Sequence, residues 1–169
     1  LRQAGHEFPN PPITSPATTQ WLQLVIDALC DLSSRDALTG LANRRQFELA
    51  ISREVDRVAR TGEPALVLML DIDHFKNVND QYGHQVGDAV LINLVKHCQK
   101  ELRVIDIFGR VGGEEFFIVL PESSELEAFQ VAERLREFIA SESTHCDTGA
   151  EIRITISIGV ATFNPKLVG

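Results

Sequence analysis

Four acidic side chains stand in two short clusters that could together hold a metal ion. Asp71 and Asp73 follow the apolar run 65–70, and Glu114 and Glu115 follow two consecutive glycines. If the clusters converge, repulsion within each pair of carboxylates costs about 1 kcal/mol at roughly 4 Å in water and about 4 kcal/mol at partial burial. Convergence therefore favours a bound divalent cation, and ligands that are all oxygen indicate Mg²⁺ or Mn²⁺.

A metal held by two or three carboxylates usually keeps open positions for substrate phosphates. Lys76 and Arg110 lie close by in sequence to supply fixed positive charge. A calcium-binding EF-hand is the obvious alternative, but Phe75 and Lys76 occupy loop positions that require a ligand and a glycine, and Tyr82 stands where the bidentate Glu belongs. Taken alone, the two acidic residues after the glycines read more simply as a solvated turn.

The two glycines separate an extended segment, 105–111, from an apolar run, 116–120. Since a glycine takes positive φ without a steric clash, this pattern predicts a tight hairpin with both glycines at positive φ. Adjacent strand residues point to opposite faces, so Glu114 and Glu115 are not expected to lie against the same surface.

Helical and strand-like patterns alternate around these clusters. In chain order we predict a helix at about 44–60, a strand at 65–70, a short helix at 74–80, a turn at 83–87, a helix at 88–102, the hairpin, a helix that Ser123 or Ser124 caps and that runs to about Ser141, and a strand at 152–160. The run 65–70 is apolar at every position, which suits a central strand covered on both faces. The order predicts an α+β fold, a ferredoxin-like sandwich in which helices cover one face of a mainly antiparallel sheet.

The N-terminal part has a different character. Residues 1–19 contain four prolines and no apolar period, which predicts a flexible linker. A linker or stalk helix is expected at 20–35, and its apolar seam of alternating three- and four-residue steps comprises Leu22, Val25, Leu29 and Leu32. Such a seam is typical of a two-stranded coiled coil, and a helix lying on its own domain is the alternative.

Composition limits the kind of protein. The chain has 169 residues, 44% of them hydrophobic and 24% charged, as expected for one globular domain with an appended segment. A net charge of −8 argues against DNA or RNA as a partner but permits a small phosphorylated ligand. No apolar run reaches the length of a membrane span, no signal peptide opens the chain, and three widely spaced cysteines indicate reduced thiols in the cytoplasm. Because the chain starts at Leu1 and its only methionine is Met69, we expect a fragment of a longer protein, which could be attached to a membrane.

A set of motifs from Asp36 to Val160 resembles the GGDEF family of diguanylate cyclases in order and spacing. The motifs are DxLTGLxNRR at 36–45, DIDxFKxxND at 71–80, GH at 83–84, GD at 87–88, RxGGEEF at 110–116 and SIGV at 157–160. Any one of them is weak evidence, but the set is highly specific. The resemblance implies the nucleotidyl-cyclase and polymerase-palm version of the ferredoxin-like sandwich, with residues 36–169 as the catalytic domain.

The resemblance implies that two GTP molecules condense into cyclic di-GMP with release of two pyrophosphates, at the interface of a homodimer. It assigns Mg²⁺ to Asp71, the backbone carbonyl of Ile72 and Glu114, with Glu115 as a further ligand. Glu114 would also help to deprotonate the attacking 3′-hydroxyl.

The resemblance also implies the remaining substrate contacts. Asn79 and Asp88 would read the guanine edge, Lys76 would steady the phosphates and the transition state, and Phe75 and Arg110 would complete the substrate site. An upstream sensor domain is expected in the full-length protein.

A second site is indicated by Arg103 and Asp106, which match the family's RxxD inhibitory site, and Arg57 matches a secondary arginine of that site. An Arg fork suits guanine or phosphate, and an Asp suits the guanine donors; a bare RxxD would otherwise be a surface ion pair. An extended segment 106–112 would cover about 20 Å, so product bound at this site would have to inhibit allosterically.

Family members continue beyond the SIGV strand into another helix and a strand, which we expect to be absent from a chain that ends at Gly169. Loss of their basic phosphate contacts would weaken triphosphate binding. The alternative function is therefore a cyclic di-GMP receptor with little or no turnover. A phosphodiesterase is disfavoured, because the sequence has no second metal cluster of the expected kind.

Overall fold

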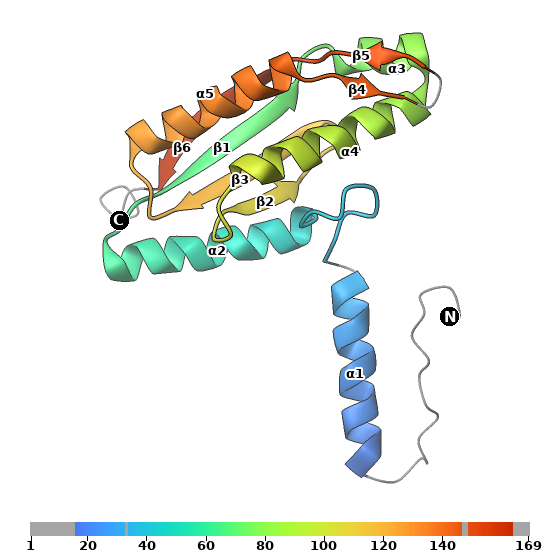
Figure 1. The fold of residues 1–169 in the computed structure, drawn as a ribbon. Coiled ribbons are helices and arrows are strands. Elements are labelled where there is room, and N and C mark those ends of the chain that lie inside the picture. Colours follow the sequence, from blue (N-terminus) through green and yellow to red (C-terminus); the bar gives the residue numbers. More distant parts are fainter. Residues whose placement is uncertain (1–15, 33, 147–148, 164–169) are drawn as a thin grey trace. The chain divides into compact units, whose positions relative to one another are not determined.

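The computed structural model describes residues 16–32, 34–146 and 149–163 (Figure 1). The chain divides into two compact units, Leu1–Arg35 and Asp36–Gly169. The first unit contains helix α1 (Pro16–Leu32), which begins four residues before the predicted start at residue 20. Proline is compatible with a first helical turn, because the N–H that it lacks would have no partner there.

Two leucines of the predicted apolar seam of α1, Leu22 and Leu29, are 47% and 54% exposed. Val25 is half-buried. The side chain of Leu32 and the predicted linker before Pro16 lie outside the described residues. None of the helices in the described part of the chain is long and apolar enough to cross a membrane.

In its described residues the second unit contains four helices and six strands. They are α2 (Arg44–Thr61), β1 (Ala65–Ile72), α3 (Phe75–Tyr82), α4 (His84–Glu101), β2 (Ile107–Arg110), β3 (Glu115–Pro121), α5 (Glu125–Ser141), β4 (Thr144–His145), β5 (Glu151–Ile152) and β6 (Ile156–Phe163). The main sheet has the order β2-β3-β1-β6, and β4 pairs with β5 in a second sheet. Every strand pair is antiparallel, which confirms the predicted α+β class.

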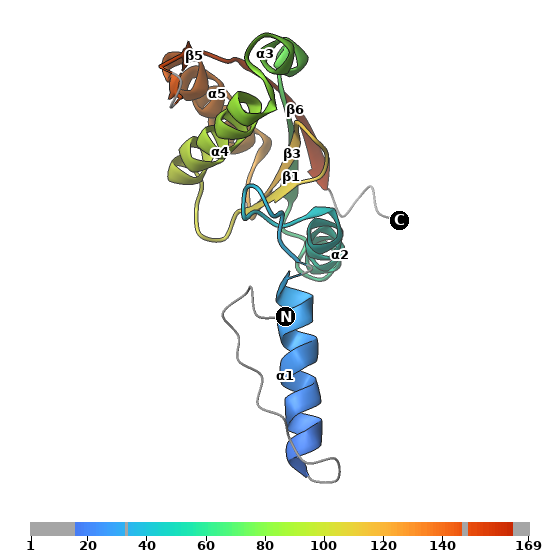
Figure 2. The ribbon, with the colours of Figure 1, turned by 90° about the vertical axis from the view of Figure 1, so that its right-hand side faces the viewer.

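The main core lies between the sheet and helices α4 and α5, which cover one face (Figures 1 and 2). Leu66, Leu68 and Leu70 of β1 are fully buried in it. Alternate residues of β1 point to the other face, where Val67 packs with Phe47 of α2 and with β3. The prediction that helices cover only one face is therefore wrong, because α2 covers part of the second face.

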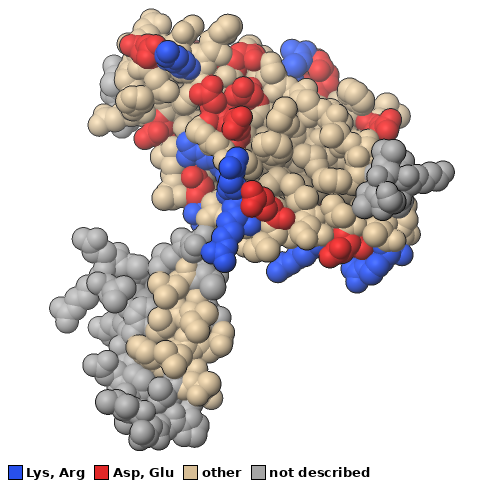
Figure 3. Space-filling model, turned by 180° about the vertical axis from the view of Figure 1, so that it is seen from behind, with Lys and Arg blue, Asp and Glu red and all other residues tan. Residues whose placement is uncertain are grey.

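Helix α2 approaches the sheet closely because β2 carries a glycine beneath it. A Cβ at Gly109 would lie 2.5 Å from the ring of Phe47, so no larger residue fits there without displacing the helix. The cover ends before the end of β1, and Met69 is 53% exposed. The prediction that β1 is covered on both faces therefore holds only for its first half. On this face, charge is sparse over the sheet, and acidic side chains gather toward the end where β1 runs into α3 (Figure 3).

Two predicted boundaries are wrong for identifiable reasons. Helix α4 begins at His84 rather than at residue 88, because Gly83, with φ of 86°, is enough to separate it from α3. The predicted strand 152–160 is interrupted, and its two ends pair in different sheets as β5 and β6. At the interruption the Thr155 carbonyl accepts a hydrogen bond from the backbone N–H of Asp73.

The start of α5 agrees with the sequence. Ser124 caps the helix, and its hydroxyl and the side chain of Glu127 form a reciprocal capping box.

Cys98 and Cys146 form no disulfide. Burial raises the pKa of the Cys98 thiol to about 12, so this cysteine stays protonated and unreactive at neutral pH.

Candidate functional site

The end of β1 brings together carboxylates from two strands. Asp71 stands directly opposite Glu115 of β3 and, on its other side, opposite Ser157 of β6. Residues that are directly opposite in an antiparallel pair have Cβ atoms about 5 Å apart on one face. Asp71 and Glu115 are both exposed, so their carboxylates leave the sheet side by side on the face that α2 leaves open.

These groups fit a magnesium ion that arrives with a nucleotide. The Ile72 side chain is 2% exposed and buried in the core, so only its backbone carbonyl is suited to join Asp71 and the two glutamates as an oxygen ligand. Within the described ranges, no three carboxylate, imidazole or thiol groups converge as they would in a site built wholly from protein. Mg²⁺ is commonly held by one or two carboxylates, with substrate phosphates and water completing its shell.

Asp73 is held elsewhere, although the sequence clusters it with Asp71. Its two carboxylate oxygens accept hydrogen bonds from the hydroxyls of Ser157 and Thr155, each 2.6 Å long. The bond from Ser157, followed by the bond from Thr155, holds the pKa of Asp73 below its usual value. Asp73 therefore ties the start of β6 to the loop after β1.

The glycine turn differs from the predicted tight hairpin. Neither Gly112 nor Gly113 takes a positive φ. The turn is closed by the backbone N–H of Val111, which donates to the Glu115 carbonyl at 3.0 Å. Gly112 is needed for space instead, because a Cβ there would lie 2.2 Å from Oε2 of Glu115. The Glu115 carboxylate thus lies against the backbone of the turn.

Arg110 braces this turn. Its Nη2 donates to the Gly113 carbonyl at 2.7 Å, and its Nη1 donates to Oδ1 of Asp36 at 3.0 Å. Asp36 also accepts hydrogen bonds from the backbone N–H and the hydroxyl of Thr39. Burial alone would raise the pKa of Asp36, but the hydrogen bonds from Thr39 and Arg110 outweigh it and hold that pKa below its usual value.

The family resemblance implies that Arg110 contacts the substrate. In the structure its guanidinium binds Asp36 and the Gly113 carbonyl. Both Asp36 and Arg110 belong to recognisable motifs. They lie 74 residues apart, and no sequence signal pairs them.

The two residues predicted to read the guanine edge lie on neighbouring helices, Asn79 on α3 and Asp88 on α4. A Cβ at Gly87 would lie 1.9 Å from Oδ1 of Asn79 and 3.3 Å from the ring of Phe75. Gly87, the residue before Asp88, therefore leaves space on α4 for the Asn79 amide and the buried ring of Phe75. Asp88 is exposed, as is Lys76 in the first turn of α3.

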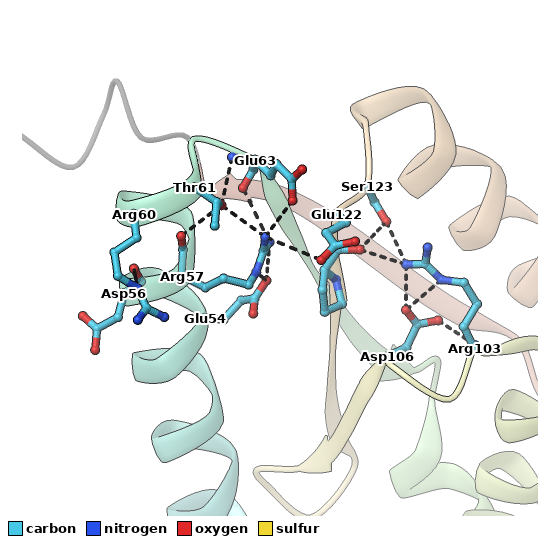
Figure 4. Close-up of polar contacts among 11 residues, drawn as sticks. Glu54, Asp56, Arg57, Arg60, Thr61, Glu63, Arg103, Asp106, Glu122 and Ser123 are labelled. Carbon is cyan, nitrogen blue, oxygen red and sulfur yellow. Dashed lines mark hydrogen bonds and ion pairs between the residues drawn. The ribbon is translucent and has the colours of Figure 1, made fainter.

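The second predicted site forms a polar cluster at the other end of β2 (Figure 4). Arg103 binds Oδ1 of Asp106 through both Nε and Nη2, at 3.0 and 2.8 Å. Its Nη2 also donates to the Pro121 carbonyl at 3.1 Å and to the Ser123 hydroxyl at 2.9 Å. The Asp106 side chain is only 2% exposed. The arrangement is thus more than a surface ion pair.

Arg57 reaches the same region from α2. Its closest partner is the buried Glu54, whose Oε1 lies 2.7 Å from Nη2, and Glu63 and Glu122 lie at 3.4 and 3.9 Å from Nη1. Figure 4 shows Glu122 in the turn between β3 and α5, with Arg57 on one side and Arg103 on the other. The sequence reasoning missed this contribution, because the segment that includes Ser123 reads only as a helix cap.

A cavity of about 370 Å³ lies apart from both clusters. It is lined by Asp73 and His74, by one side of α3 that includes Tyr82, and by segment 151–155. The predicted metal ligands Asp71 and Glu114 do not line it.

Comparison with known sequences identifies relatives over most of the chain. The family described as "Diguanylate cyclase, GGDEF domain" matches residues 33–167. The response regulator PleD of Caulobacter vibrioides is 37% identical over 144 residues, which are 85% of this chain and 32% of PleD. The diguanylate cyclase DosC of Escherichia coli is 40% identical over 129 residues, which are 76% of this chain and 28% of DosC. The chain thus spans about a third of the length of these relatives.

Solved structures agree with the sequence relatives. The coiled coil and GGDEF domain of DgcB from Caulobacter crescentus, in complex with c-di-GMP, matches with a TM-score of 0.82 at 28% identity, over 89% of this chain and 80% of that one. The active GGEEF domain of a diguanylate cyclase from Vibrio cholerae matches with a TM-score of 0.66 at 36% identity, over 72% and 76% of the two chains. With the antiparallel sheet and the braced glycine turn, these matches show that the chain belongs to the GGDEF family of diguanylate cyclases.

Proposed function

We propose that this domain is a diguanylate cyclase, which condenses two GTP molecules into cyclic di-GMP and releases two pyrophosphates. The observation that carries the proposal is the cross-strand pairing of Asp71 with Glu115 beside the braced glycine turn, on an open face of the sheet. The relative DosC, at 40% identity, is named for this activity. GTP is an intracellular metabolite, so the cytoplasm is the proposed location.

The chemistry requires two copies of the domain. The 3′-oxygen of one GTP attacks the α-phosphorus of the other, a new P–O bond forms, and the bond to the β-phosphate oxygen breaks as pyrophosphate leaves. The ring closes in a second step of the same kind, in which the 3′-oxygen of the second nucleotide attacks the α-phosphorus of the first and a second pyrophosphate leaves. Each domain holds one GTP, so two domains must face each other in a homodimer. The rate per protein molecule should therefore rise with protein concentration.

The ion in this proposal is Mg²⁺, or Mn²⁺, held by Asp71, the Ile72 carbonyl and Glu114, with Glu115 as a further ligand. When bound, it neutralises charge on the triphosphate. Glu114 also accepts the proton of the attacking hydroxyl. Placing these carboxylates in advance is the main contribution of the protein, since phosphoryl transfer depends mostly on positioning and electrostatics.

The guanine and the phosphates are bound by α3 and α4. Asn79 and Asp88 bind the base edge; the Asp88 carboxylate accepts from N1 and N2 of guanine, a contact that adenine does not offer. Lys76 supplies positive charge at the phosphates. Phe75 and Asn79 both lie close to Gly87 of α4, and Arg110 holds the turn at which Glu114 stands.

We further propose that cyclic di-GMP binds at Arg103 and Asp106, with Arg57 as a secondary contact, and inhibits the enzyme. Arg103 presents a guanidinium fixed by Asp106 and by the Ser123 hydroxyl. Strand β2 separates this cluster from the glycine turn, so product bound there acts from a distance.

A receptor without turnover is the second candidate, because the hydrogen-bonded cluster around Arg103 includes none of the proposed metal ligands. Incubation with GTP and Mg²⁺, followed by chromatography of the products, separates the two functions. We expect cyclic di-GMP from the wild type, none from Glu114→Ala, and product formation with weaker inhibition from Arg103→Ala. A wild type that binds cyclic di-GMP and forms none would establish the receptor instead.

A further inference from the structure

Glu122 has an unfavourable backbone conformation. Its φ is 51°, and among the described residues only His74 shares a left-handed φ without being glycine. This conformation is strained for any residue with a Cβ, and glycine would relieve the strain. Strained residues that persist are often held in place for a function.

The strained turn places a carboxylate between two arginines. Oε1 of Glu122 lies 3.9 Å from Nη1 of Arg57. The residues on either side, Pro121 and Ser123, both accept hydrogen bonds from Arg103. Figure 4 shows the Glu122 side chain in the gap between the two guanidinium groups. The hydrogen bonds that Arg57 donates to Glu54, and Arg103 to Asp106, raise the pKa values of the two arginines. Attraction to Glu122 adds to this effect on both.

The charges around this gap oppose an anionic ligand. Two arginines face four carboxylates in ion pairs, those of Glu54, Glu63, Asp106 and Glu122. The Glu127 carboxylate also attracts Arg103, but Ser124 holds it in the capping box of α5. Two of the four are fixed, because the side chains of Glu54 and Asp106 are 9% and 2% exposed. Glu63 and Glu122 are 60% and 58% exposed and are free to turn into solvent. Of these two, only Glu122 acts on both arginines.

We propose that Glu122 is a built-in competitor for phosphate at the Arg57–Arg103 gap. Its carboxylate occupies the gap in the free protein and must turn away before the phosphates of a cyclic dinucleotide bind. The inference rests on the proposed inhibitory site and adds a residue that sets its affinity, and hence the product concentration at which inhibition begins.

Removal of the Glu122 charge should strengthen binding. An exposed carboxylate near 4 Å from an arginine contributes modestly, and two arginines share this one, so we expect Glu122→Gln to bind cyclic di-GMP on the order of fivefold more tightly. Its affinity should also fall more steeply with salt, because one carboxylate fewer then opposes the attraction of the two arginines for phosphate. Glu122→Gly removes both the charge and the strain, and should tighten binding to a similar degree.

Calorimetric titration of the full chain with cyclic di-GMP tests the inference. The matched control is Glu133→Gln on α5, which removes an equally exposed carboxylate that pairs with Arg136. Tighter binding by both Glu122 variants, with Glu133→Gln unchanged, supports the competitor. Tightening by Glu122→Gly alone would assign the effect to strain and overturn it.

The Arg103→Ala variant separates the two proposals. If the wild type binds in an Arg103-dependent way and Glu122→Gln binds no more tightly, the inference fails and the inhibitory site stands. If neither the wild type nor Glu122→Gln binds, or if Arg103→Ala binds like the wild type, the inhibitory site is wrong and the inference falls with it.

Discussion

Three glycines of this domain act by leaving room for a neighbouring side chain. A Cβ would lie 1.9 Å from Asn79 at Gly87, 2.5 Å from Phe47 at Gly109, and 2.2 Å from Glu115 at Gly112. At Gly109 the neighbour is a buried ring of the core, whereas at Gly112 it is the mobile end of an exposed carboxylate. The two positions should therefore differ in their effects, on stability for Gly109 and on chemistry for Gly112.

Gly112→Ala should reduce turnover with little loss of stability. The new methyl group must displace the Glu115 carboxylate, and misplacement of a reacting group by about 1 Å costs on the order of 100-fold in rate. Unfolding in urea should change by less than about 1 kcal/mol, because the displaced group is exposed. The control is Gly113→Ala, where a Cβ would meet nothing within 4 Å. Equal losses of activity in both variants would contradict this role of Gly112.

At the scale of elements, the loop that opens the second unit is joined to the glycine turn through Asp36 and Arg110. This contact links two segments that the sheet itself does not pair, apart from a single bridge between Ala42 and Gly109. Helix α2 secures the same corner by packing Phe47 over β2. The turn that carries Glu114 is thus held in place by strands β2 and β3 and by the loop that contains Asp36.

The strength of this link should depend on pH. The folded-state pKa of Asp36 is below its usual value of about 3.9, so the ionised carboxylate stabilises the fold above that pH and loses its effect as the pH falls through the folded pKa. Asp36→Asn should lower the free energy of unfolding by about 1–2 kcal/mol at pH 7. The difference from the wild type should shrink below about pH 4.

Urea unfolding at pH 7 and pH 3 measures this effect. Asp56→Asn on α2 is the control, since Asp56 is exposed. A difference between Asp36→Asn and the wild type that is the same at both pH values would show that the charge of Asp36 does not act through these hydrogen bonds.

In the whole molecule, motif spacing and hydrophobic period were sufficient to predict the fold class and the meeting of the two strand ends that carry Asp71 and Glu115. An antiparallel sheet makes neighbours of strands that are far apart in the chain, so two strand ends with carboxylates were expected to meet. The assignment of Asn79 and Asp88 to the guanine edge followed from the family motifs and stays a prediction.

Contacts between side chains distant in sequence could not be predicted. Periodicity does not show that Arg110 binds Asp36, or that Glu122 lies between two arginines, because such contacts depend on how turns fold in three dimensions. The interruption of the predicted strand 152–160 at Thr155 could not be seen in the sequence for a similar reason. The isoleucine alternation continues through it, while the backbone turns aside to bind Asp73.

The central claim is that Asp71 and Glu114 share one ion with the triphosphate of GTP. Titration of GTP with and without Mg²⁺ tests it, with Asp71→Asn as the variant and Asp73→Asn as the control, because Asp73 is bound by Ser157 and Thr155. We predict that Mg²⁺ strengthens GTP binding in the wild type and in Asp73→Asn, and has little effect in Asp71→Asn. An equal effect of Mg²⁺ in the wild type and in Asp71→Asn would contradict the claim.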